Sequence, residues 1–169
     1  MGLRTSDLLR DDRNRELLAL LRDDPRMATS EVARRVGMSA PAVRERLLRL
    51  EEAGVIAGYR LVLDPAALGY PICVYVRVRP APGQLRAVAE LAQRLPQVVE
   101  CHRVTGEDCF IMKIYLAALD QLDQVLDQFL AFGQTTTSLV QSSPVPLREL
   151  PLPGEVQAPL TRAAMSRSA

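Results

Sequence analysis

The chain has 169 residues, 48% of them hydrophobic and 24% charged, which is typical of a soluble globular protein with one ordinary or two small domains. Its apolar runs are shorter than the roughly 18 residues that a membrane span needs, and charged residues occupy the N-terminal stretch where a signal peptide would need an apolar core. These features argue against a membrane or secreted protein and predict a cytoplasmic one, in which the 3 cysteines are reduced thiols.

The net charge of +1 conceals an uneven distribution of arginine. Five arginines but only one acid, Glu45, lie between residues 34 and 49. This stretch is therefore a local basic patch in an otherwise neutral chain.

Residues 6 to 54 have apolar residues at helical spacing and no strand signals, which predicts three helices. Thr29 or Ser30 is expected to cap the second helix, and Ser39 the third. Each helix is followed by a residue that stops helices: Pro25, Gly37 and Gly54.

The second and third of these helices, with the glycine turn between them, have the layout of a DNA-binding helix-turn-helix. Their spacing lets four apolar side chains form one small core, namely Val32, Val36, Val43 and Leu47. That core is expected to turn five residues toward solvent or the flanks, namely Pro41, Arg44, Glu45, Arg46 and Arg49. Such a face can enter a major groove while flanking arginines meet phosphates. A small helical bundle with a merely solvated charged face is the alternative.

Strand signals begin after Gly54, and a strand over residues 56–65 is expected to link the two halves. The elements expected next are a strand over 71–79, a helix over 83–95, strands over 97–105 and 109–117, a helix over 119–132 and a strand over 135–142. This β-α-β-β-α-β order is the ferredoxin-like arrangement, so we predict an α+β protein. The C-terminal stretch has no clear period and is expected to be a loose tail.

The segment CHRVTGEDC, residues 101–109, concentrates residue types that bind metals or perform acid–base chemistry. Cys101 and His102 are adjacent on a predicted strand, so their side chains should point to opposite faces. His102 is the only histidine, and no second Cys-x-x-Cys pair completes a zinc set. We therefore expect neither a metal site nor a catalytic residue here, and no cofactor.

Three motifs, in order and spacing, resemble the Lrp/AsnC (feast/famine) family of prokaryotic transcription regulators: NRELLALLRDDPR, SEVARRVGMSAPAVRERLLRLEEAGVIAGYRLVLDPAALG and HRVTGEDCFIMKIYL. With GQTTTSLVQSSPVP, the resemblance covers residues 13 to 147. It implies a winged-helix-like DNA-binding domain over 1–55, a hinge strand over 56–66, a ferredoxin-like effector and oligomerisation domain over 67–150 and a flexible tail over 151–169.

The resemblance further implies a regulator in the bacterial cytosol or nucleoid whose partners are double-stranded DNA, other copies of the chain and an amino acid or related small metabolite. Homodimers would form through the ferredoxin-like domain and assemble further, commonly into octamers. DNA contact would fall on Arg34 and on the start of the recognition helix and its arginines, namely Ser39, Ala40, Pro41, Arg44, Glu45, Arg46 and Arg49. Arg46 could equally be structural, because the family has a patterned R…L pair there.

The effector site would be formed by a turn between two strands, namely Val104, Thr105, Gly106, Glu107 and Asp108, and by the residues Gln134, Thr135, Thr136, Thr137 and Ser138. The chain departs from the family pattern at this turn. Asp108 stands where an aromatic residue is usual, and Cys109 where an aspartate is usual. Since that aspartate tends to meet the effector's amino group, either Asp108 or Glu107 supplies the charge from one position away, or amino-acid binding is lost. The threonines also suit a strand without any ligand.

Two other functions share this architecture. Sirohaem decarboxylases are enzymes on the same fold, but they use histidines in a haem-sized pocket, and this chain has one histidine and no tryptophan. The second is a module that binds an effector and assembles but no longer binds DNA. The basic cluster argues against this function. We therefore predict a regulator and not an enzyme.

Overall fold

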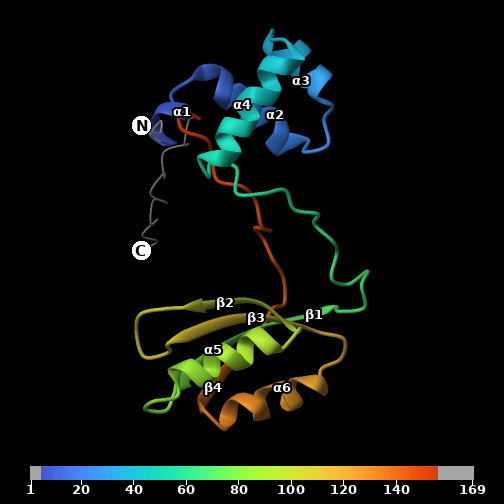
Figure 1. Cartoon of the computed structure of the whole chain (residues 1–169). Helices are drawn as coiled ribbons and strands as arrows, with labels where there is room; N and C mark the ends of the chain where they lie inside the picture. Colours follow the sequence, from blue (N-terminus) through green and yellow to red (C-terminus); the bar gives the residue numbers. More distant parts are fainter. Residues whose placement is uncertain (1–4, 156–169) are drawn as a thin grey trace, which may run out of the picture. The chain divides into compact units, whose positions relative to one another are not determined.

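The computed structural model describes residues 5–155 (Figure 1), and these form two compact units. The helical unit holds the described residues up to Arg60 together with those from Leu147 onward, and the sheet unit holds Leu61–Pro146. No helix among the described residues is long and apolar enough to cross a membrane.

The helical unit contains a short α1 (Thr5–Leu8) followed by α2 (Asp12–Asp23), α3 (Thr29–Val36) and α4 (Ala40–Glu52). Asp11 caps α2, because its carboxylate accepts hydrogen bonds from the backbone N–H groups of Arg13 and Asn14. Gly37 ends α3 in the left-handed conformation, at φ 65°. The residue before α3 is Ala28, so the expected cap by Thr29 or Ser30 is wrong; both residues lie inside the first turn.

The core of the helical unit is small. Leu17 of α2 packs against α3 and α4 through a cluster that also includes Val32, Ala33, Val36 and Val43, with Leu47 at its edge. The four apolar residues that were expected to fix the helix-turn-helix are therefore packed together. Because Val43 is fully buried, the opposite side of α4 must face solvent.

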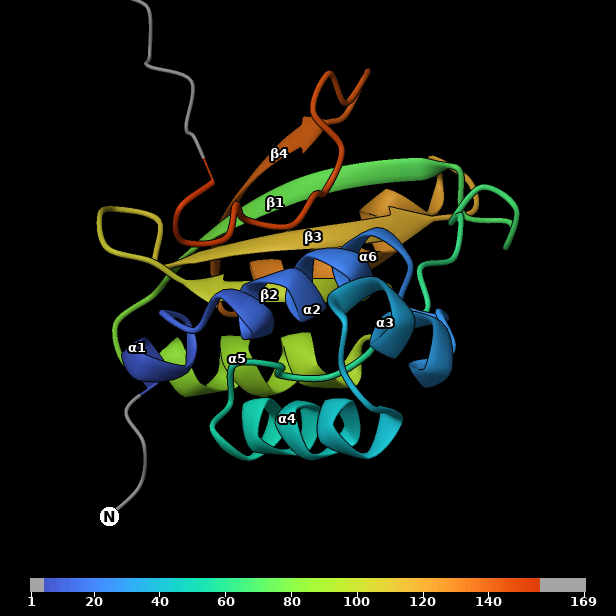
Figure 2. The ribbon, with the colours of Figure 1, turned by 90° about the horizontal axis from the view of Figure 1, so that it is seen from above.

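The sheet unit has the predicted β-α-β-β-α-β order. Its elements are β1 (Ile72–Pro80), α5 (Leu85–Arg94), β2 (Val98–Arg103), β3 (Phe110–Leu116), α6 (Gln121–Leu130) and β4 (Gly133–Leu139). The four strands are antiparallel in the order β2–β3–β1–β4, as Figure 2 shows. Both helices cover one face of the sheet (Figure 1), and the other face is called the open face below.

Strand alternation determines which side chains reach each face of this sheet. Val74, Val76 and Val78 of β1 are fully buried under the helices. The residues between them, among them Arg77, lie on the open face with the following Arg79. The core beneath the helices is completed by Phe129 of α6 and by buried residues of β3 and α5.

The hinge differs from the sequence prediction, because residues 57–64 form no strand. The segment has no partner strand within the described chain, and a strand exists only where its N–H and C=O groups are paired. Leu61 and Val62 remain 79% and 80% exposed. The strand expected over residues 56–65 is therefore wrong.

The first residues of the predicted tail are also ordered by contacts. Glu155 accepts two hydrogen bonds from the guanidinium of Arg22 on α2, at 2.9 and 2.8 Å, and one from the backbone N–H of Leu152 at 2.8 Å. These contacts attach residues 152–155 to the helical unit rather than leaving them loose. The rest of the predicted tail, 156–169, lies outside the described residues.

Gly133 opens β4 at a place with no room for a side chain. A Cβ at this position would collide with the carbonyl oxygen of Arg79 and lie 2.8 Å from the Cα of Pro80. We expect Gly133→Ala to lower the free energy of unfolding by about 2 kcal/mol, measured by urea denaturation, because the backbone of β1 must shift. Ser138→Ala, at an exposed position of the same strand, is the control and should change little. An equally stable Gly133→Ala would contradict the close pairing of β1 and β4.

Candidate functional site

The N-terminal end of α4 is built to present its backbone and side chains to solvent. The hydroxyl of Ser39 caps the helix by accepting a hydrogen bond from the N–H of Ala42 at 3.3 Å. Pro41 occupies the first turn, where its missing N–H costs nothing. Ser39, Pro41, Arg44, Glu45 and Arg49 are exposed, whereas Ala40 is half-buried against the core.

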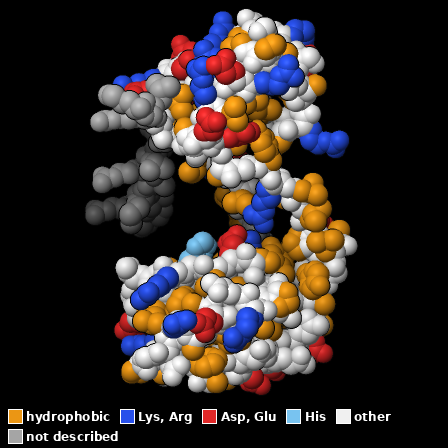
Figure 3. Space-filling model, in the orientation of Figure 1, with side chains coloured by type: hydrophobic (Ala, Val, Ile, Leu, Met, Phe, Trp, Pro, Cys, Tyr) orange, Lys and Arg blue, Asp and Glu red, His pale blue; other side chains and the backbone are white. Residues whose placement is uncertain are grey.

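The arginines of the basic cluster differ in their partners. Arg34 and Arg35 both pair with Glu31 at 2.7 Å, and Arg49 pairs with Glu45. Hydrogen bonds from Arg34 and then Arg35 lower the pKa of Glu31 to about 2. Figure 3 shows the result, with basic and acidic side chains side by side on the helical unit. A polyanion must compete with these acids for the arginines.

Arg44 is different from its neighbours. It is exposed, and it forms no ion pair with any residue in the described range 5–155. Its position, four residues into α4, places it on the leading part of the helix. Arg44 is therefore the cation of this face whose charge is not already neutralised by a neighbouring acid.

Arg46 is directed inward, against its expected role in DNA contact. Its guanidinium donates to the Asp11 carboxylate at 2.5 Å and to the Asn14 side-chain oxygen at 2.8 Å. Asn14, only 3% exposed, donates in turn to the carbonyl of Leu8 at 2.9 Å. This network favours the structural role of Arg46 over DNA contact, because the side chain links α4 to the start of α2.

Part of the predicted effector set lies at one corner of the sheet unit, where the β2–β3 turn, the end of β1 and the start of β4 converge. The turn is closed by a hydrogen bond from the Val104 N–H to the Cys109 carbonyl at 2.9 Å, and Gly106 adopts φ 115°. The side chain of Cys109 packs against the hydrophobic core. The half-buried cysteine at the family's aspartate position therefore packs toward the core.

The acids of this turn are already engaged with β1. The Arg77 guanidinium lies 3.5 Å from an Asp108 carboxylate oxygen, and that of Arg79 lies 3.4 Å from one of Glu107. Neither arginine is among the site residues predicted from the sequence. The available signal was the alternation of VYVRVR, which places both on the face opposite the buried valines.

The strand register separates the five predicted residues of β4 into two groups. Gln134 lies opposite Arg79 on β1, Thr136 opposite Arg77, and Ser138 opposite Tyr75, so all three share the open face. Thr135 and Thr137 lie opposite the buried Val78 and Val76, on the face that the helices cover. The structure therefore joins Gln134 and Thr136 to the turn acids and directs Thr135 and Thr137 elsewhere.

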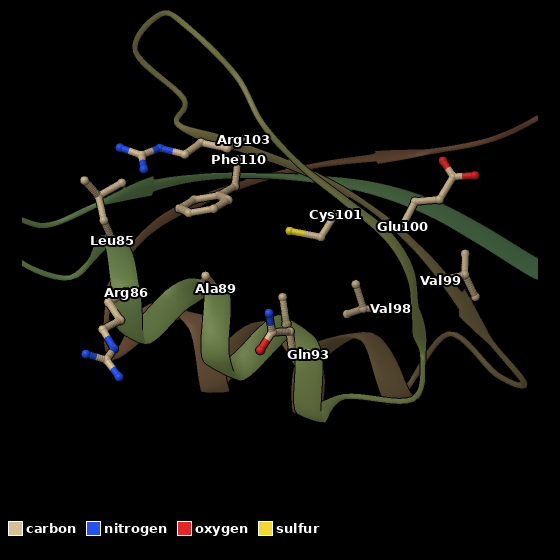
Figure 4. A pocket seen from close by; sticks show the side chains of 11 residues that line it. Leu85, Arg86, Ala89, Gln93, Val98, Val99, Glu100, Cys101, Arg103 and Phe110 are labelled. Carbon is tan, nitrogen blue, oxygen red and sulfur yellow. The ribbon is translucent and has the colours of Figure 1, made fainter. Parts of the chain in front are cut away.

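A cavity of about 660 Å³ lies between α5 and β2, away from the predicted effector residues. Figure 4 shows the Cys101 sulfur directed into it, toward Phe110, above the small side chain of Ala89. Burial raises the pKa of the Cys101 thiol, which favours its neutral form. The cavity exists because small side chains such as Ala89 line it, and no sequence pattern predicted a cavity here.

Cys101 and His102 do point to opposite faces, because Cys101 lies opposite the buried Met112 and His102 opposite Ile111. His102 is exposed, with its Nε2 3.8 Å from a carboxylate oxygen of Glu100. Among residues 5–155 no group of three or more histidine, cysteine, aspartate or glutamate side chains is placed to hold a metal ion.

A helix-turn-helix followed by a ferredoxin-like unit with a charged corner defines a two-domain DNA- and ligand-binding class of protein. Residues 10–57 match the family model for a winged helix-turn-helix DNA-binding domain, and residues 73–150 match that for the Lrp/AsnC ligand binding domain. The chain belongs to the Lrp/AsnC family.

Individual relatives agree with this assignment. The chain is 32% identical to the HTH-type transcriptional regulator LrpA of Mycobacterium tuberculosis over 119 residues, which cover 70% of this chain and 79% of that one. The solved structure of LrpC from Bacillus subtilis matches with a TM-score of 0.74 at 27% identity, over 79% of this chain and 95% of that one. The regulator NMB0573 of Neisseria meningitidis, solved in complex with L-Met, matches with a TM-score of 0.77 at 23% identity, over 85% and 97%.

The Arg46 network makes a stability prediction. The Arg46 hydrogen bond holds the pKa of Asp11 below its ordinary value of 3.8, so the pair stabilises the fold fully above that value and loses this contribution as the pH falls through the lowered pKa. Arg46→Ala should cost about 1–2 kcal/mol at pH 7, because it leaves the buried Asn14 oxygen unpaired. The loss should shrink in urea unfolding at pH 2.

Arg49→Ala is the matched control for this experiment. It removes an exposed arginine from the same helix and breaks only a surface ion pair with Glu45, so stability should hardly change. Equal losses for the two variants would contradict an anchoring role of Arg46.

Proposed function

We propose that this protein is a transcriptional regulator that binds duplex DNA through α4 and responds to an amino acid or related metabolite bound by the sheet unit. The observation that carries the proposal is the outward face of α4, where Ser39, Pro41 and Arg44 lead an exposed helix whose opposite side is buried through Val43. Membership of the Lrp/AsnC family supports both halves of the proposal. The location we propose is the cytosol or nucleoid.

The residues of the interface divide by their chemistry. Ser39, Ala40, Pro41, Arg44 and Glu45 lie at the start of α4, the part of a recognition helix that reaches base edges. Arg34 and Arg49 would exchange Glu31 and Glu45 for phosphates. Arg46 would act by positioning α4 and not by touching DNA.

We propose that the effector binds at the corner formed by residues 104–108 and the open-face residues of β4. The regulator NMB0573, whose structure contains L-Met, supports an amino acid as the class of effector. Backbone N–H groups of the turn and the hydroxyl of Thr136 suit a carboxylate, and the turn acids suit an ammonium group. No cofactor is required.

The exposed apolar hinge supports self-association of the chain. The hinge exposes Tyr59, Leu61, Val62 and Leu63 on a segment that has no partner strand in the described chain. Exposed apolar side chains on an unpaired segment are what a second copy would cover. We propose a homodimer that assembles further, to an octamer as in the family.

The alternatives are weaker. A decarboxylase on this fold needs several histidines, and the single histidine here is exposed on the open face. An assembly module without DNA binding would not need an exposed, unneutralised arginine at the leading end of α4. We therefore propose a regulator without enzymatic activity.

Arg44→Ala should weaken binding to duplex DNA from the promoter of the protein's own gene by about tenfold, since a bidentate base contact contributes about 1–3 kcal/mol. Fluorescence anisotropy over a range of salt concentrations measures it, and affinity should fall steeply with salt for both proteins. Arg94→Ala, an exposed arginine at the end of α5, is the matched control and should bind like the unaltered protein. Equal weakening by both variants, or no preference over random DNA, would refute the assignment of α4.

A further inference from the structure

We infer that the effector is an amino acid with a second carboxylate, of the aspartate or glutamate class. The inference rests on the proposed function and specifies the ligand of that same site. It comes from the charged corner, defined as Arg77, Arg79, Glu107, Asp108, Gln134 and Thr136. These side chains come from β1, the β2–β3 turn and β4. The two acids, Gln134 and Thr136 were expected from the sequence, and the two arginines were not.

The two ion pairs of the charged corner are loose enough to be exchanged for a ligand. Each is a single contact, at 3.5 Å for Arg77 with Asp108 and 3.4 Å for Arg79 with Glu107. The arginine side chains are 47% and 52% exposed. Exposed pairs of this kind contribute little, so a ligand that offers better-placed charges can replace them.

The number and sign of these charges select the ligand. Arg77 and Arg79 are two residues apart on one face of β1, so their guanidinium groups can each receive one carboxylate of the same small molecule. Asp108, released from Arg77, is then free to accept the ligand's ammonium group, while the more exposed Glu107 can turn to solvent. A neutral amino acid supplies only one carboxylate and leaves one arginine dependent on its original partner.

The surroundings of the charged corner also disfavour an apolar side chain. On β4, Gln134 lies opposite Arg79 and Thr136 opposite Arg77, which gives an amide and a hydroxyl along this edge. Ile111 of β3, opposite Arg77 on the other side, is half-buried and is the one apolar neighbour that the register supplies there. A leucine or methionine side chain would desolvate polar groups here without pairing them.

Isothermal titration of the full-length protein tests the inference, with L-glutamate, L-aspartate, L-glutamine, L-asparagine, L-methionine and L-leucine as probes. One of the acidic amino acids should bind about tenfold or more tightly than its amide, the ratio expected for one charge-assisted contact. Arg79→Gln should remove this preference by weakening the acid and not the amide. Arg94→Gln, an exposed arginine elsewhere on the unit, should leave every affinity unchanged.

The outcomes that contradict an acidic effector differ from those that contradict amino-acid sensing itself. If L-methionine or L-leucine binds as tightly as the acids, or if Arg79→Gln leaves the preference intact, the ligand class is wrong and amino-acid sensing stands. If Arg86→Gln and not Arg79→Gln abolishes binding, the ligand occupies the cavity beside α5 and the charged corner is excluded. If none of the six binds, both the inference and the proposed amino-acid effector fail.

Discussion

The exposed face of α4 is determined by what its other side buries. Val43 is enclosed by α2 and α3, and Arg46 is bonded to Asp11 and Asn14 at the start of α2. One contact is apolar and fixes the rotation of the helix, while the other is ionic and directional and fixes its position along α2. With both in place, Arg44 can point only outward. Loss of either contact would let α4 rotate or shift, so the residues proposed to read DNA would no longer share one exposed face.

Self-neutralisation of arginine by nearby acids recurs in both units. Glu31 and Glu45 hold arginines of the helix-turn-helix, and Glu107 and Asp108 hold Arg79 and Arg77 at the corner of the sheet. The chain has 20 acidic residues beside its 21 basic ones, so its net charge is only +1, and in both clusters the acids lie close enough to the arginines to pair with them. This pairing also means that binding DNA or an anionic effector is an exchange of partners, which makes affinity depend on geometry as well as on charge. A simple count of basic residues would overstate the strength of either site.

Periodicity predicted most of this fold because burial has a period in helices and strands, so Val43 and the three inner valines of β1 could be placed from their spacing. The ends of the elements and the direction of long side chains have no such period. Arg46 was left open because its direction depends on Asp11, 35 residues away. Arg77 and Arg79 were not predicted because their partners, Asp108 and Glu107, are distant in sequence and lie beside β1 only in the folded chain. The hinge was assigned to a strand because its residue types favour one, but residue types say nothing of a pairing partner.

The central claim is that the start of α4 is the surface that meets DNA. Hydrogen–deuterium exchange of the full-length protein, measured by mass spectrometry with and without a duplex from its own promoter, tests this directly. On DNA binding, amide exchange should slow mainly in peptides spanning residues 37–49, where the first backbone N–H groups of α4 lack partners within the helix. Slowing confined to the sheet unit, with residues 37–49 unchanged, would contradict it.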